Sequence, residues 1–234
     1  MKTSNKLLLA ALIILTGSMV AYDTALKAEY QTGNFKSRFR NLEQQQVGQF
    51  NTIRVNSANL ISVSIEHNSS SKVWISKWVK DRVTVESKNG ELIIDVKEKY
   101  KADERQVRGS ILILCPKVVK ITTKSDSANS KYIDNRQLTV TGFDQRELNL
   151  DLGLTTDAFL EKTKLNALKA KVGGRTGESS LMIANNNQIA TADIEVPGKN
   201  HLELLDPDIK SAKLNLADSS KITLMGRALS LVKK

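Results

Sequence analysis

The stretch AKLNLADSSKITLMG, residues 212–226, contains two short alternating runs separated by a polar corner. Leu214 and Leu216 flank an asparagine in the first run, and Ile222 and Leu224 flank a threonine in the second. A period of two places successive side chains on opposite faces of a strand. The stretch therefore predicts two strands, each with one apolar and one polar face.

Two earlier segments superpose on this one, KAKVGGRTGESSLMI from Lys169 and ADIEVPGKNHLELL from Ala192. Val196 precedes Leu216 by 20 positions, and the glycine-rich insertion GGRTGES accounts for a longer interval before it. A period near 20 residues with two strands per repeat is typical of a β-solenoid. We therefore predict an all-β solenoid with stacked columns of Leu, Ile and Val. A β-sandwich is the main alternative.

Alternation begins at Phe50 and continues through the rest of the chain. The stretch VTVESKNGELIIDV, residues 83–96, places Asn89-Gly90 between two runs and predicts a β-hairpin, because a primed turn needs positive φ at both central residues. Residues 23–49 are polar and show neither period, which suggests a juxtamembrane helix followed by a linker. The predicted organisation is a hydrophobic helix at 1–22, a juxtamembrane linker at 23–49 and a solenoid domain at 50–234.

The N-terminus has the layout of a signal sequence or membrane anchor. Lys2 and Lys6 precede sixteen uncharged residues, from Leu7 to Tyr22. A helix of that length covers about 24 Å, short of a bilayer core of about 30 Å, which favours a signal peptide. No clean A-x-A site follows and the helix could continue, so a cleaved signal and an uncleaved anchor both stay open. The predicted membrane-anchor residues are Leu7, Leu8, Leu9, Leu12, Ile13, Ile14 and Leu15.

Basic residues before the apolar run favour a cytoplasmic N-terminus and an exported remainder. We therefore expect the protein in the cell envelope, facing the periplasm or the cell surface. A buried helix of a soluble protein is the alternative reading of this segment. If the helix is not cleaved, the membrane itself is a predicted partner.

Charge and composition exclude several kinds of partner. The net charge is +10, but acidic and basic residues are interleaved, and the continuous basic stripe of a nucleic-acid site is missing. The single cysteine, Cys115, lies in an apolar run and forms no intrachain disulfide. His67 and His201 are far apart in sequence, which leaves too few ligands for a zinc site. We predict no nucleic-acid partner, no metal and no cofactor.

The acidic residues show no catalytic pattern. Asp144, Asp151 and Asp157 are close in sequence but form no pair at strand spacing, and Asp206-Pro-Asp208 resembles a corner. The glycines at 173–177 lack the lysine of a phosphate-binding loop. We predict no catalytic residue, with a carbohydrate-active enzyme that uses paired acids as the alternative.

Trp74 and Trp78 form the candidate binding surface. Lysines 72, 77 and 80 flank them. On a strand the two tryptophans share one face, opposite Val73, Ile75 and Val79. Exposed there, they could stack on sugars or face a membrane. Alternatively, they cap the first coil or pack beneath the linker.

The sequence from Phe50 to the C-terminus resembles the head GIN domain family of autotransporter-adhesin-like proteins, known mainly from Bacteroidota. The similarity lies in FNTIRVNSANLISVSIEHNSSSKVWIS at 50–76, the 83–96 stretch, ILILCPKVVKITTKSDS at 111–127 and the later repeats. The segment DTALKAEYQTGNFKSRF after the hydrophobic run resembles membrane-tethered members. The resemblance implies a right-handed parallel β-helix-like domain outside the cytoplasm and carries no catalytic motif.

The predicted function is an exported, membrane-associated β-solenoid module for surface or envelope interaction, without catalysis. Its expected partners are the membrane, through the N-terminal helix, and a carbohydrate or a surface protein. A carbohydrate-active enzyme on a β-helix scaffold and a periplasmic structural or regulatory domain remain as alternatives.

Overall fold

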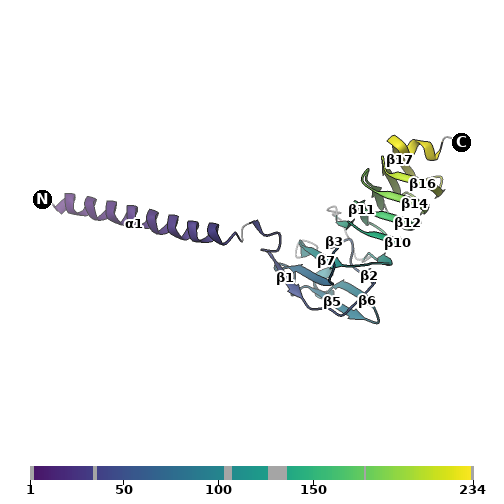
Figure 1. The fold of residues 1–234 in the computed structure, drawn as a ribbon. Helices are drawn as coiled ribbons and strands as arrows, with labels where there is room; N and C mark the ends of the chain where they lie inside the picture. The colour runs from purple at the N-terminus through teal and green to yellow at the C-terminus, as the bar shows by residue number, and fades with distance from the viewer. Residues whose placement is uncertain (1–2, 34–35, 103–106, 126–135, 177, 233–234) are drawn as a thin grey trace. The chain divides into compact units, whose positions relative to one another are not determined.

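The computed structural model describes residues 3–33, 36–102, 107–125, 136–176 and 178–232. The chain divides into two compact units, Met1–Leu42 and Glu43–Lys234. Figure 1 shows the first as one long helix and the second as two β-sheets.

The first unit contains helix α1, Thr3–Thr32, which has no buried residue. The seven predicted anchor side chains are between 50% and 72% exposed. Within the described part of the chain, α1 is the one helix long and apolar enough to cross a membrane, a test that signal sequences also pass. Its thirty residues extend about 45 Å. Gly33, at φ 66°, follows the last helical residue in the left-handed conformation that commonly ends helices.

Residues 23–49 contain two different structures. The first ten continue α1 to Thr32, because DTALKAEYQT holds good helix formers and no glycine or proline. Strand β1, Leu42–Gln45, follows later and forms the first edge of a sheet. The boundary between the two units therefore lies before Phe50, where the alternation begins.

The second unit is built from one nine-stranded and one eight-stranded sheet. The larger has the order β1, β4 (Lys72–Ser76), β7 (Ser110–Cys115), β3 (Ser62–His67), β9 (Gln137–Thr141), β11 (Asp157–Glu161), β13 (Ser180–Ile183), β15 (His201–Leu205), β17 (Lys221–Met225). The smaller has the order β16 (Asp208–Leu216), β14 (Gln188–Val196), β12 (Lys164–Val172), β10 (Asp144–Leu152), β8 (Lys120–Thr123), β2 (Thr52–Val55), β6 (Glu91–Val96), β5 (Val83–Lys88). Short helices are α2 (Glu98–Lys101) and η3 (Gly226–Leu231).

The predicted right-handed parallel β-helix-like solenoid over 50–234 is wrong. Both sheets are mixed, since β4 pairs antiparallel with β7 and β5 pairs antiparallel with β6. The strand order is also not sequential, because β7 lies between β4 and β3 and β2 lies between β8 and β6. The 20-residue period that suggested a solenoid occurs only in the later part of the chain. In the earlier part, the antiparallel pairs β5–β6 and β4–β7 interrupt the repeat.

Two local predictions are confirmed. The hairpin at 83–96 forms with Lys88 opposite Glu91, and Asn89 and Gly90 both have positive φ. In the later repeats, Val196 lies opposite Leu216 on neighbouring parallel strands. The strands β10, β12, β14 and β16 follow one another side by side (Figure 1).

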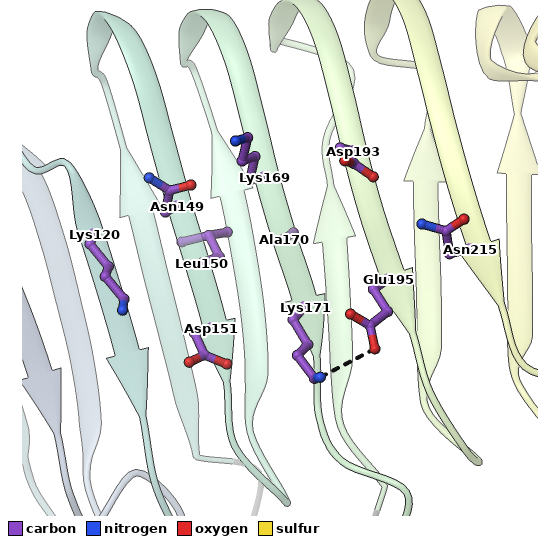
Figure 2. A pocket seen from close by; sticks show the side chains of 10 residues that line it. All are labelled: Lys120, Asn149, Leu150, Asp151, Lys169, Ala170, Lys171, Asp193, Glu195 and Asn215. Carbon is purple, nitrogen blue, oxygen red and sulfur yellow. Dashed lines mark ion pairs between the residues drawn. The ribbon is translucent and has the colours of Figure 1, made fainter.

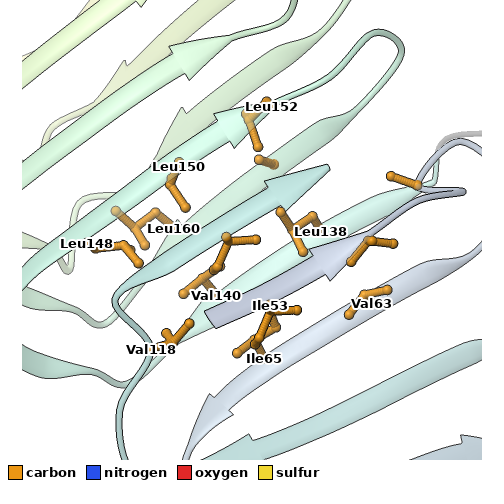
Figure 3. Close-up of a cluster of buried hydrophobic side chains, with 14 of the residues drawn as sticks. Ile53, Val63, Ile65, Val118, Leu138, Val140, Leu148, Leu150, Leu152 and Leu160 are labelled. Atoms are coloured by element: carbon orange, nitrogen blue, oxygen red, sulfur yellow. The ribbon is translucent and has the colours of Figure 1, made fainter. Parts of the chain in front are cut away.

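Aliphatic side chains from both sheets form one core. Figure 3 shows part of it, where Ile53 and Leu150 come from the eight-stranded sheet and Ile65, Val140 and Leu160 from the nine-stranded sheet. These five side chains are at most 2% exposed. Full burial of each such side chain contributes about 1.5–3 kcal/mol, so the core is the main source of stability.

Buried polar side chains occupy the corners that precede several strands. Thr163, Ser179, Asn187 and Asn200 are each at most 2% exposed. The Thr163 N–H donates to Asn187 Oδ1 at 3.0 Å, and the Ser179 N–H donates to Asn200 Oδ1 at 2.8 Å. Each contact connects one corner to the corner of the neighbouring parallel strand. It therefore satisfies buried backbone N–H groups that the hydrogen bonds between strands do not reach.

Candidate binding surfaces

The outer side of the eight-stranded sheet carries a set of polar side chains, which we call the charged face. Strand alternation directs them outward, because their neighbours Leu150, Ala170 and Ile194 point into the core and are at most 6% exposed. They line a depression of about 450 Å³ (Figure 2). The members of the charged face are Lys120, Asn149, Asp151, Lys169, Lys171, Asp193, Glu195 and Asn215.

Charge alternates from strand to strand across this face. In one row Asp151 on β10 lies opposite Lys171 on β12, which lies opposite Glu195 on β14. In the next row Lys169 lies opposite Asp193. Neighbouring strands are about 4.8 Å apart, so the cations and carboxylates of β10, β12 and β14 are close neighbours.

Lys171 Nζ forms an ion pair with Glu195 Oε1 on this face, at 3.2 Å (Figure 2). Both side chains are about half exposed, at 49% and 48%. Exposed pairs of this kind contribute only about 0–1 kcal/mol. The pair therefore adds little to stability, and the charged side chains of this face stay exposed to solvent.

The three aspartates close in sequence do not come together. Asp151 belongs to the charged face, whereas Asp144, at the start of the same strand, pairs with Lys164 at 3.4 Å. Asp157 lies on β11 in the other sheet and accepts a hydrogen bond from Ser180 Oγ at 2.6 Å. The sequence pattern missed Asp193 and Glu195, although both sit at the polar positions of a repeat. Their shared face with Asp151 appears only once the strands are aligned.

Asp206 lies in the corner before β16, at φ 59°. Its Oδ1 accepts hydrogen bonds from the Arg227 backbone N–H at 2.7 Å and from Arg227 Nε at 3.1 Å. These bonds, the backbone one first, hold the pKa of the Asp206 carboxyl below its ordinary value. The corner predicted at Asp206-Pro-Asp208 is present, and Asp206 attaches η3 to it.

The glycine-rich segment forms another corner. Gly173, at φ 71°, lies so close to the Asn200 side chain that an added Cβ would fall 2.3 Å from Asn200 Oδ1. Glycine is thus required there both by conformation and by space. Residue 177, at the end of this motif, lies outside the described residues.

The two tryptophans have different surroundings. Val73 and Ile75 on β4 are buried, as the alternation predicts. However, β4 ends at Ser76, so Val79 is buried in the following turn and the prediction that the two tryptophans share one strand face is wrong. Trp74 lies on β4 and is half-buried, opposite Leu112 on β7. Trp78 lies in the turn after β4 and is 77% exposed.

A second depression of about 370 Å³ borders this turn. Lys80 Nζ contacts Glu43 Oε2 there at 2.8 Å, and this hydrogen bond raises the pKa of Lys80. Gln45 Nε2 donates to the Val85 carbonyl at 3.0 Å. The depression is lined by Glu43, Gln44, Gln45, Gln46, Ile75, Lys80 and Asp81.

Cys115 is fully buried, and burial raises the pKa of its thiol to about 12. A thiol in this state is a poor nucleophile, because the thiolate is the reactive form. Among the described residues, no group of three His, Cys, Asp or Glu side chains could hold a metal ion. His201 instead lies 3.2 Å from a Glu203 carboxylate oxygen, and His67 packs edge-on against Phe143.

Several solved structures are similar to this chain. A candidate adhesin from Bacteroides fragilis is 13% identical with a TM-score of 0.49, over 79% of this chain and 96% of the other. A candidate lipid-binding protein from Parabacteroides distasonis is 12% identical with a TM-score of 0.40, over 77% of this chain and 95% of the other. A candidate adhesin from Parabacteroides merdae is 10% identical with a TM-score of 0.40, over 79% and 95%. No family model matches the sequence, and no curated protein matches it.

Proposed function

We propose that this protein is an exported, membrane-anchored and non-catalytic module that binds an extended envelope polysaccharide through the charged face. The observation that supports this is the set of neighbouring lysines and carboxylates on the parallel strands β10, β12 and β14, with Lys120 on β8 and Asn215 on β16 beside them. A rigid sheet holds these groups in place, so a ligand meets them already ordered. Such preorganisation lowers the entropic cost of binding.

The chemistry of the face suits a hydroxyl-rich polymer that carries charged groups. Carboxylates such as Asp193 and amides such as Asn149 accept hydrogen bonds from hydroxyls. Lysines such as Lys169 donate hydrogen bonds and attract acidic substituents. A polymer lying across β10, β12 and β14 would meet Asp151, Lys171 and Glu195 in turn. Weak contacts then add up along its length.

Anchoring by α1 is the second part of the proposal. The helix is long and apolar enough to cross a bilayer, and none of its side chains is buried in protein. Lysines 2 and 6 precede its apolar run, which favours a cytoplasmic N-terminus and export of the sheets. Membership of the head GIN domain family is also proposed, on the sequence resemblance alone.

The binding test uses the full chain in nanodiscs on an array of bacterial polysaccharides. We expect the double variant Lys169→Gln/Lys171→Gln to lose at least tenfold in affinity for the glycan that the native chain binds. Lys164→Gln is the matched control, since Lys164 is an exposed lysine on the same strand outside the charged face. No glycan bound by the native chain, or equal binding by the double variant, would refute the polysaccharide proposal. Capture of a surface protein instead would assign the face to a protein partner.

Anchoring is tested separately by cell fractionation with N-terminal sequencing of the mature protein. We expect an intact N-terminus in the membrane fraction that resists alkaline extraction. A soluble product that begins after the apolar run would show that the helix is a cleaved signal.

A carbohydrate-active enzyme is a second candidate, because of Asp193 and Glu195. The two acids lie on the same face of β14, two residues apart, and both line the depression. That spacing places their Cα atoms about 6.6 Å apart along the strand, so their carboxyl groups can approach the separation of about 6.5–9.5 Å found in inverting glycosidases. Release of reducing ends from a bound glycan, abolished in Asp193→Asn and in Glu195→Gln, would establish this function.

A further inference from the structure

We propose that the turn carrying Trp78 contacts the surface of the bilayer that holds α1, through anionic lipid headgroups. This inference rests on the anchored form of the proposed function and goes beyond it, because it assigns a second membrane contact outside α1. The turn comprises residues 77–82 between β4 and β5.

Strand order places this turn at one end of the second unit. β4 lies next to β1, the edge strand of the nine-stranded sheet, and β5 is the edge strand of the eight-stranded sheet. Figure 1 shows β1 and β5 at the same end of the sheets, away from β16 and β17. The chain therefore enters the sheets from α1 at the end where Trp78 lies.

The short connection keeps this end near any membrane that holds α1. Only ten residues separate Thr32, the last residue of α1, from Glu43. A fully extended chain covers at most about 3.6 Å per residue, so this connection reaches about 40 Å. A tether of that length gives the turn a high effective concentration at the bilayer surface.

Trp78 has the exposure and chemistry of an interfacial residue. Its exposed fraction, 77%, is the largest among the large hydrophobic side chains of the described residues. Tryptophan is enriched at membrane–water interfaces, where its apolar ring and its polar N–H both find suitable surroundings. Burial of the ring at the bilayer surface removes this apolar area from water.

The charges around Trp78 favour an anionic surface. Residues 72–82 carry four basic groups and one acid, a net charge of +3. Lys72, Lys77 and Lys80 are near Trp78 in the sequence and all three are exposed, and Lys80 Nζ also contacts Glu43. Basic side chains close to anionic lipid are attracted within about one Debye length. A ring flanked by exposed lysines can insert while their ammonium groups stay at the headgroups.

The test uses tryptophan fluorescence, since the chain has two tryptophans. Full-length Trp74→Phe, with Trp78 as the single tryptophan, is reconstituted in phosphatidylglycerol-containing vesicles with or without brominated lipid. We expect a blue-shifted emission that brominated lipid quenches at least twofold. The matched control Trp78→Phe retains the half-buried Trp74 and should show little quenching. If Trp74→Phe does not fold, the difference between the native chain and Trp78→Phe reports Trp78.

Three results would overturn the inference. The first is a Trp78 emission typical of a ring in water and unaffected by brominated lipid, measured on a chain whose α1 is shown by protease protection to be inserted. Such a result would leave the proposals of anchoring and glycan binding intact. The second is equal quenching in purely phosphatidylcholine vesicles, which removes the role of anionic headgroups. The third is loss of glycan binding in Trp78→Phe without quenching in the vesicles, which assigns Trp78 to a sugar site.

Discussion

Replacement of Asn187 by alanine tests whether buried corner side chains hold neighbouring strands together. Asn187 is fully buried just before β14. Its Oδ1 accepts hydrogen bonds from the Thr163 N–H at 3.0 Å and the Thr163 hydroxyl at 2.7 Å. Its Nδ2 donates to the carbonyls of Leu160 and Ala184, both at 2.7 Å.

The cost of Asn187→Ala depends on which partners keep another hydrogen bond. The Leu160 carbonyl still accepts from the Ala184 N–H, and the Ala184 carbonyl still accepts from the Asn187 N–H. The N–H and hydroxyl of Thr163 both lose their acceptor. Each buried donor left unsatisfied costs about 1–3 kcal/mol, so two give about 2–6 kcal/mol. We expect a loss of about 3 kcal/mol in the free energy of unfolding, because the hydroxyl can rotate towards another acceptor.

The assay is urea unfolding of the full chain in mild detergent, followed by far-UV circular dichroism. Asn185→Ala is the matched control, since Asn185 is exposed two residues earlier and its backbone carbonyl keeps its bond from Arg227. We expect the control to change the free energy of unfolding by less than about 0.5 kcal/mol. A cost for Asn187→Ala below about 1 kcal/mol, or one equal to the control, would refute a role for the corner in stability.

Two further predictions concern ionisable groups. Because Arg227 lowers the pKa of Asp206 below 3.8, the charged carboxylate stabilises the fold above that pH, and this contribution is lost as pH falls through the lowered pKa. Asp206→Asn should therefore show a smaller loss of Tm on acidification below pH 3.8 than the native chain, and parallel Tm curves would contradict this. Because burial raises the pKa of Cys115 to about 12, iodoacetamide at mildly alkaline pH should modify the thiol only after urea unfolding. Equal labelling of the folded chain would show that Cys115 is accessible.

The face of most strands could be predicted from sequence because side-chain alternation is a local property of extended backbone, although Leu216 and Ile222 in the last two strands are 41% and 37% exposed. Val73 and Ile75 on β4 point inward as expected. The Asn89-Gly90 turn is also local, because it depends only on the φ angles that two residues adopt.

The choice of neighbouring strand was decided by the tertiary structure. β2, β6 and β8 are all short runs of β-branched residues, so periodicity does not distinguish one partner from another. The solenoid prediction failed for this reason, since a repeat found in the later strands was extended to the earlier ones. The eight-stranded sheet is mixed because a local hairpin pairs β5 antiparallel with β6, whereas the nine-stranded sheet is mixed through the long-range antiparallel pair of β4 with β7.

The sequence by itself determined an apolar N-terminal segment, the inward side chains and the 20-residue alignment of Val196 with Leu216. Only the tertiary structure decided that Lys171 meets Glu195 on one face, and that Asn187 binds the corner of the preceding strand. The physical reason is distance along the chain. Alternation and turns depend on neighbouring residues, whereas a charged face or a buried corner exists only when strands 20 or more residues apart are brought into register.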